Sequence, residues 1–100
     1  MGINDTGATP WLRMCTFRAY GPPGSDVPRE AQFAAHMWSA ATVEDRVQHV
    51  RVRCAAARLD IGIVLMAVDD SKARAAGARI CTAAIASAPE THGWILQTLP

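Results

Sequence analysis

The sequence predicts an α+β fold of the ferredoxin-like type, with the element order βαββαβ. Three observations predict it. Residues 61–68 (IGIVLMAV) form an apolar run of strand length. A segment with helical spacing lies on each side of that run, and β-rich segments stand near both ends of the chain. This order gives a four-stranded antiparallel sheet with two helices on one face.

Composition is typical of one small globular domain. The chain has 100 residues, half of them apolar, and ten Lys and Arg stand against nine Asp and Glu. The high apolar content excludes a disordered tail. The near-neutral charge argues against nucleic-acid binding, which needs a basic excess. We expect a flexible leader over residues 1–10 and a single domain over residues 11–100.

The first half of the chain predicts a strand and a helix. Residues 11–20 (WLRMCTFRAY) are rich in β-formers, and the Gly-Pro-Pro-Gly sequence at 21–24 ends the strand. Ser25 and Asp26 are good N-cap residues, and Pro28 suits a first helical turn. The helix is therefore expected to run to about residue 41, with one apolar stripe made of Phe33, Ala34, Met37 and Ala41.

Residues 42–57 fit two periods. Val43, Val47, Val50, Cys54 and Ala57 recur at helical spacing, whereas residues 50–54 (VRVRC) alternate as in a strand. We favour the strand, because valine dominates the apolar positions and a short link to the next strand makes a hairpin. The alternative keeps this segment helical and gives a three-stranded sheet under three helices.

The second half predicts a central strand, a helix and a last strand. Residues 59–68 are apolar on both faces, as in a strand covered on both sides. Polar residues 69–71 cap a second helix that ends before Pro89. Gly77 lies in the middle of this helix, where glycine costs about 1 kcal/mol relative to alanine; this predicts a close approach to the sheet. Residues 93–99 form the last strand.

The central strand also predicts an association surface. One alternation is expected to face the helices, namely Leu59, Ile61, Ile63 and Leu65. The other side chains then lie on the open face of the sheet, namely Val64, Met66 and Val68, joined by Phe17 and Cys15 from the first strand. An apolar patch of this kind marks an interaction site, and two-fold homodimers are the commonest oligomers. We expect a homodimer; a leader folded over the sheet and plain exposure are the alternatives.

One polar row stands out. If residues 46–54 are a strand, then Val47, His49, Arg51 and Arg53 share one of its faces. A His-Arg-Arg row can bind a carboxylate or a phosphate. The same pattern also suits the solvated face of an edge strand, where charges deter aggregation.

Other chemical signals are missing from the sequence. No catalytic motif, phosphate-binding loop or metal-ligand spacing is present, so we expect no cofactor and no metal. The three cysteines, Cys15, Cys54 and Cys81, lie far apart, which is typical of free thiols in a reducing, cytoplasmic setting. No apolar run reaches the length of a membrane span, and the central strand lacks the aromatic run of an RNA-binding domain.

The sequence thus favours a non-catalytic accessory or interaction domain that self-associates through its sheet and binds a protein partner. Two alternatives stay open. One is a cofactor-independent dimeric α/β-barrel enzyme of the monooxygenase or isomerase type, which needs an apolar cavity between sheet and helices. The other is a regulatory domain that binds a small molecule at the subunit interface, beside residues 21–24.

Overall fold

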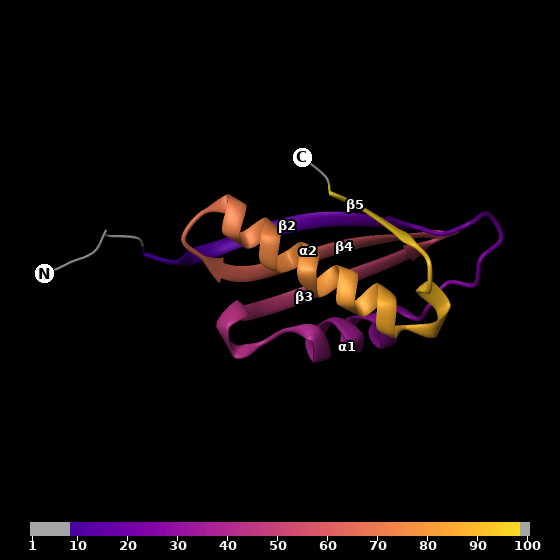
Figure 1. Ribbon diagram of the computed structural model, residues 1–100, viewed down its shortest axis with the longest axis horizontal. Helices are drawn as coiled ribbons and strands as arrows, with labels where there is room; N and C mark the ends of the chain where they lie inside the picture. Colours follow the sequence, from indigo (N-terminus) through magenta and orange to yellow (C-terminus); the bar gives the residue numbers. More distant parts are fainter. Residues whose placement is uncertain (1–8, 99–100) are drawn as a thin grey trace, which may run out of the picture.

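The elements follow one another in the predicted order. The computed structural model describes residues 9–98, so most of the predicted leader lies outside the described residues. The elements are β2 (Trp11–Tyr20), α1 (Glu30–Ala40), β3 (Val47–Ala55), β4 (Arg58–Ala67), α2 (Asp70–Ser87) and β5 (Ile95–Thr98), with short 3-10 helices at Val43–Asp45 (η1) and Pro89–Thr91 (η2). The strands form one antiparallel sheet in the order β3-β4-β2-β5 (Figure 1). The ferredoxin-like prediction is confirmed, and residues 47–55 are a strand.

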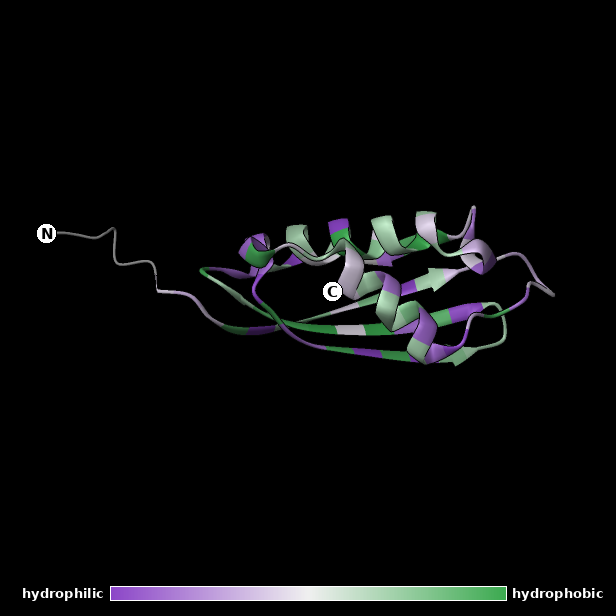
Figure 2. Cartoon of the chain, turned by 90° about the horizontal axis from the view of Figure 1, so that it is seen from below, coloured by the Kyte–Doolittle hydropathy of each residue, from purple (hydrophilic) through white to green (hydrophobic). Residues whose placement is uncertain are grey.

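Both helices cover the same face of the sheet, which leaves the opposite face open (Figure 2). Helix α2 packs on β2 and β4, whereas α1 packs on β3 and on α2. The largest fully buried side chains between the two layers include Phe17, Phe33, Met37, Leu65 and Ile80. Neither helix in the described part of the chain is both long and apolar enough to cross a bilayer.

Strand β4 fixes the two sides of the sheet. Its side chains alternate between buried and half-buried from Arg58 to Met66. The buried set is the predicted one, namely Leu59, Ile61, Ile63 and Leu65. Val64 and Met66 therefore lie on the open face, as predicted, and are only partly exposed because β2 and β3 flank them.

The predicted phase of β2 is wrong. Phe17 and Cys15 do not join the open face, because they are buried beneath α2 with 0% and 7% exposure. Their register partners Ile61 and Ile63 also face the helices. The reason is the space above Phe17, since the missing side chain of Gly77 in α2 lets the ring come close to the helix.

The predicted start of the first helix is also wrong. Helix α1 begins at Glu30 with Arg29 as its N-cap, and no side chain caps it. Val27 precedes Pro28, and a residue before proline is disfavoured in the helical region. Ser25 instead closes the preceding turn, because its hydroxyl donates to the carbonyl oxygen of Pro22 at 2.6 Å. The predicted cap of α2 is confirmed, since the Asp69 carboxylate accepts from the Lys72 amide at 2.7 Å.

The predicted face of Val47 is wrong, because a bulge interrupts the start of β3. The pairing of β3 with β4 shifts between Val47 and His49, so Gln48 is an extra residue. Val47 consequently pairs with the buried Leu65 and packs on the core. His49 and the two arginines after it lie on the open face, so the predicted row loses only Val47.

A buried carboxylate fixes the loop between α1 and β3. Asp45 accepts hydrogen bonds from the Thr42 amide and hydroxyl at 2.7 and 3.1 Å, and it forms an ion pair with Arg79 of α2. Burial alone would raise the pKa of the Asp45 carboxyl. The hydrogen bonds from Arg79 and Thr42 outweigh burial and hold this pKa below its ordinary value of 3.8.

The first prediction concerns Gly77. A Cβ at this position would lie 2.8 Å from Cε2 of the fully buried Phe17 ring, so the ring or the helix would have to shift. Alanine normally stabilises a helix relative to glycine, but Gly77→Ala is expected to lower the free energy of unfolding by about 1–3 kcal/mol. Urea denaturation measures it. Gly62→Ala is the control, because its Cβ would meet nothing closer than 3.9 Å. A Gly77→Ala variant as stable as the wild type would contradict the packing.

The second prediction concerns Asp45. Because its folded pKa is depressed, Asp45 contributes stability above the ordinary carboxyl value of 3.8, and this contribution is lost as pH falls through the folded pKa. Asp45→Asn should lower the free energy of unfolding by about 1–3 kcal/mol at about pH 7. The gap to the wild type should shrink at about pH 3. Urea denaturation at both values checks this, with the exposed Asp26→Asn as control; an unchanged gap at low pH would refute the assignment.

Candidate functional site

The candidate site is the open face of the sheet, opposite α1 and α2. Its half nearest the start of β2 is apolar. Leu12 pairs with Met66 across the two central strands, and Met14 pairs with Val64. Side chains at such paired positions touch, so these four residues form one continuous patch, which we call the apolar half. Leu12 and Met14 remain 63% and 67% exposed.

The other half of the same face is basic. Arg53 of β3, Asp60 of β4 and Arg18 of β2 lie side by side in the register, with Arg51 and Arg58 in the neighbouring rows. We call these five residues the basic half. Asp60 is the sole acid at the described strand positions of the open face. The basic half therefore carries four guanidinium groups and one carboxylate.

Asp60 neutralises only one side of this group. Its Oδ1 accepts from Nε of Arg18 at 2.6 Å, and its Oδ2 lies 3.4 Å from Arg58. Hydrogen bonding with Tyr20 and with Asp60 raises the pKa of the Arg18 guanidinium. Arg51 and Arg53 form no ion pair or hydrogen bond with any side chain in residues 9–98. Both are exposed, so the β3 side of the face carries two uncompensated positive charges.

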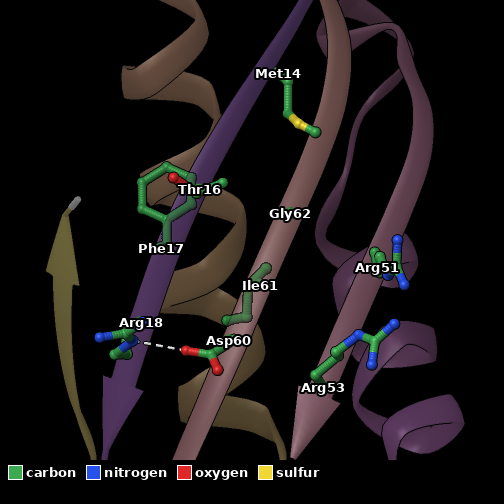
Figure 3. A pocket seen from close by; sticks show the side chains of 9 residues that line it. All are labelled: Met14, Thr16, Phe17, Arg18, Arg51, Arg53, Asp60, Ile61 and Gly62. Atoms are coloured by element: carbon green, nitrogen blue, oxygen red, sulfur yellow. Dashed lines mark hydrogen bonds and ion pairs between the residues drawn. The ribbon is translucent and has the colours of Figure 1, made fainter. Parts of the chain in front are cut away.

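A hollow of about 290 Å³ lies where the two halves meet (Figure 3). Gly62 of β4 forms its floor, between Thr16 of β2 and Arg51 of β3. Met14 bounds the hollow on the apolar side, and charged side chains bound the opposite side. The full lining comprises Met14, Thr16, Phe17, Arg18, Arg51, Arg53, Asp60, Ile61 and Gly62.

The predicted site residues are thus divided. His49, Arg51, Arg53, Val64 and Met66 lie on the open face, as expected. Phe17 lies in the core, and only its position beneath the strands makes it part of the lining of the hollow. Val68 lies beyond the end of β4 and contributes its carbonyl oxygen, which accepts from Arg13 at 3.0 Å.

Sequence reasoning missed several residues of the face. Leu12 and Met14 were not assigned, because both faces of β2 carry apolar residues and the pattern does not settle its phase. Arg18 and Gly62 were not assigned because their proximity to Arg51 and Arg53 depends on the strand register. The sequence does contain one indication of this site, namely Gly62, because glycine inside a strand often marks a place where a ligand or another backbone comes close.

The cysteines and histidines form no reactive group with these residues. All three cysteines are free thiols. Burial raises the pKa of the Cys15 thiol and raises that of Cys81 to about 12, so neither is activated as a nucleophile. Within the described ranges, no three His, Cys, Asp or Glu side chains gather as a metal site. The chemistry available on this face is recognition of an anion by arginine.

Comparison with known proteins adds no assignment. No protein-family model, no curated protein and no solved structure matches the chain.

Proposed function

We propose that this chain is a small non-catalytic accessory domain that self-associates through the apolar half of its open sheet face. The observation that carries the proposal is the exposure of Leu12 and Met14, which lie on a central strand beside the apolar Val64 and Met66. No described element covers this part of the sheet. Contiguous apolar side chains at such a position are typical of an interaction surface.

A second copy fits this surface. A two-fold axis that crosses the strands at the apolar half places the four apolar side chains of each copy against those of the other. The basic halves then extend in opposite directions and stay apart. A two-fold axis parallel to the strands would instead place the two basic halves against each other, which like-charge repulsion disfavours. We therefore propose a dimer whose two-fold axis runs across the strands at the apolar half.

The size of the patch implies moderate affinity. Full burial of a Leu, Val or Met side chain contributes roughly 1.5–3 kcal/mol, and association itself costs about 4–15 kcal/mol. Val64 and Met66 are already half-buried in one protomer, so the gain from four side chains per copy is of the same order as that cost. We expect a dimer that dissociates on dilution.

The structure favours this proposal over the enzyme alternative. A barrel enzyme of this kind needs an apolar cavity between sheet and helices. Here the side chains of Phe17, Phe33, Met37 and Ile80 fill the middle of that layer and are fully buried. The hollow described above opens instead on the outer face of the sheet. Three free thiols support the further proposal that the domain works in the cytoplasm.

The third prediction tests the dimer. The wild type is expected to sediment as a dimer of the 10.7 kDa chain at high concentration, and Met14→Glu as a monomer with an unchanged circular dichroism spectrum. Met66→Glu should act in the same way, because two buried glutamates would face the partner's apolar half. Analytical ultracentrifugation over a dilution series measures both.

Val43→Glu is the matched control, because Val43 is 88% exposed and lies on η1, away from the open face. It should dimerise like the wild type. A wild type that stays monomeric at high concentration would refute the proposal that a second copy covers the apolar half. A different protein would then be the partner of this surface. A folded Met14→Glu dimer of unchanged affinity would also overturn the proposal.

A further inference from the structure

We infer that the hollow above Gly62 binds a small carboxylate with an apolar body. Its residues all belong to one protomer, so this inference does not rest on the dimer. Three observations carry it. Two arginines without a partner lie at the rim of the hollow, and the packing of one protomer does not require the glycine at its floor. The side chain of Met14 makes one end of the hollow apolar.

The arginines supply the charge. Arg51 and Arg53 lie two residues apart on the same face of β3, so their side chains emerge about 7 Å apart. Asp60 is held by Arg18 and Arg58 and makes no ion pair with either of them. Each guanidinium therefore keeps its donors free, and its planar fork matches a carboxylate in a bidentate pair.

Gly62 supplies the space. Glycine inside a strand costs about 0.5–1 kcal/mol relative to alanine, so it calls for a reason. No clash within the protomer supplies one, since a Cβ here would meet nothing nearer than Arg51 Cβ at 3.9 Å. The β3 bulge lies at Gln48, away from the row of Gly62. What the glycine does provide is the floor of the hollow, on which a flat apolar group can rest (Figure 3).

The shape of the lining selects the ligand class. Met14 lies at one end of the floor, and Arg53 and Arg18 lie at the other end, with Arg51 at the β3 side. An inorganic anion would use the arginines and leave the apolar end uncovered. A neutral apolar molecule would leave the arginines unused. A small aromatic or aliphatic monocarboxylate uses both, and a volume of about 290 Å³ admits one such molecule.

The fourth prediction uses benzoate and hexanoate as probes, with calorimetric titration at constant ionic strength. Both should bind the wild type, whereas benzamide and inorganic phosphate should bind at least about tenfold more weakly. Arg51→Gln combined with Arg53→Gln should weaken benzoate binding by about tenfold or more. Gly62→Val should abolish it by filling the floor, and Asp60→Asn should tighten it by removing a negative charge from the lining of the hollow.

Arg29→Gln combined with Arg46→Gln is the matched control, because it makes the same change in net charge at exposed residues outside the hollow. It should bind benzoate like the wild type. Circular dichroism confirms that each variant folds; if Gly62→Val does not, the exposed arginine pair alone decides. Failure of both probes to bind at millimolar concentration, equal binding of phosphate or benzamide, or full binding by the arginine variant would each overturn the inference.

The oligomer and the ligand site fail separately. Met66 belongs to the apolar half but does not line the hollow, so a monomeric Met66→Glu variant should still bind benzoate. Benzoate binding by a wild type that never dimerises would refute the dimer alone. A dimer that binds neither probe would refute the ligand site alone.

Discussion

The structure depends on the packing of α2 against the middle of the sheet through Gly77 and Phe17. Their contact brings the helix so close that a single Cβ would collide with the ring. It sets the phase of β2, because Phe17 must face the helix and every second residue follows it. Leu12, Met14 and Arg18 are thereby directed to the open face. One close contact inside the core thus decides which residues the domain presents outside it.

This dependence explains how far the sequence could be interpreted. The order of elements was predictable, since the alternation of Val50 to Cys54 and the double apolar run of β4 are local signals. The phase of β2 was not, because Cys15 and Phe17 on one face and Leu12 and Met14 on the other are equally apolar. Gly77 signalled a close approach, but its partner in the sheet depends on the tertiary fold. The bulge at Gln48 was likewise invisible, because no residue type marks it.

The candidate site shows the same division. The row of His49, Arg51 and Arg53 was evident from period-two spacing alone. Its meaning depends on what lies beside it, and strand register brings Gly62, Asp60 and Arg18 there from two other strands. Asp60 is decisive among them, since it pairs with Arg18 and Arg58 and so leaves the β3 arginines uncompensated. A sequence pattern can place charges on one strand, but only the register shows which of them are already paired.

The edge position of β3 offers a simpler role for its arginines, since charges on an edge strand deter pairing with other chains. Part of this edge is already closed, because the Glu30 carboxylate of α1 accepts from the Cys54 amide at 2.9 Å. Protection of the β3 edge also requires no particular residue in the neighbouring strand β4. It gives no reason for a glycine at position 62, where any small side chain would fit within the protomer. Arg51 pairs with Gly62 in one row of the sheet, and Arg53 lies on the same face two residues further along β3. The proposed ligand, seated above Gly62 and beside the arginines, accounts for both.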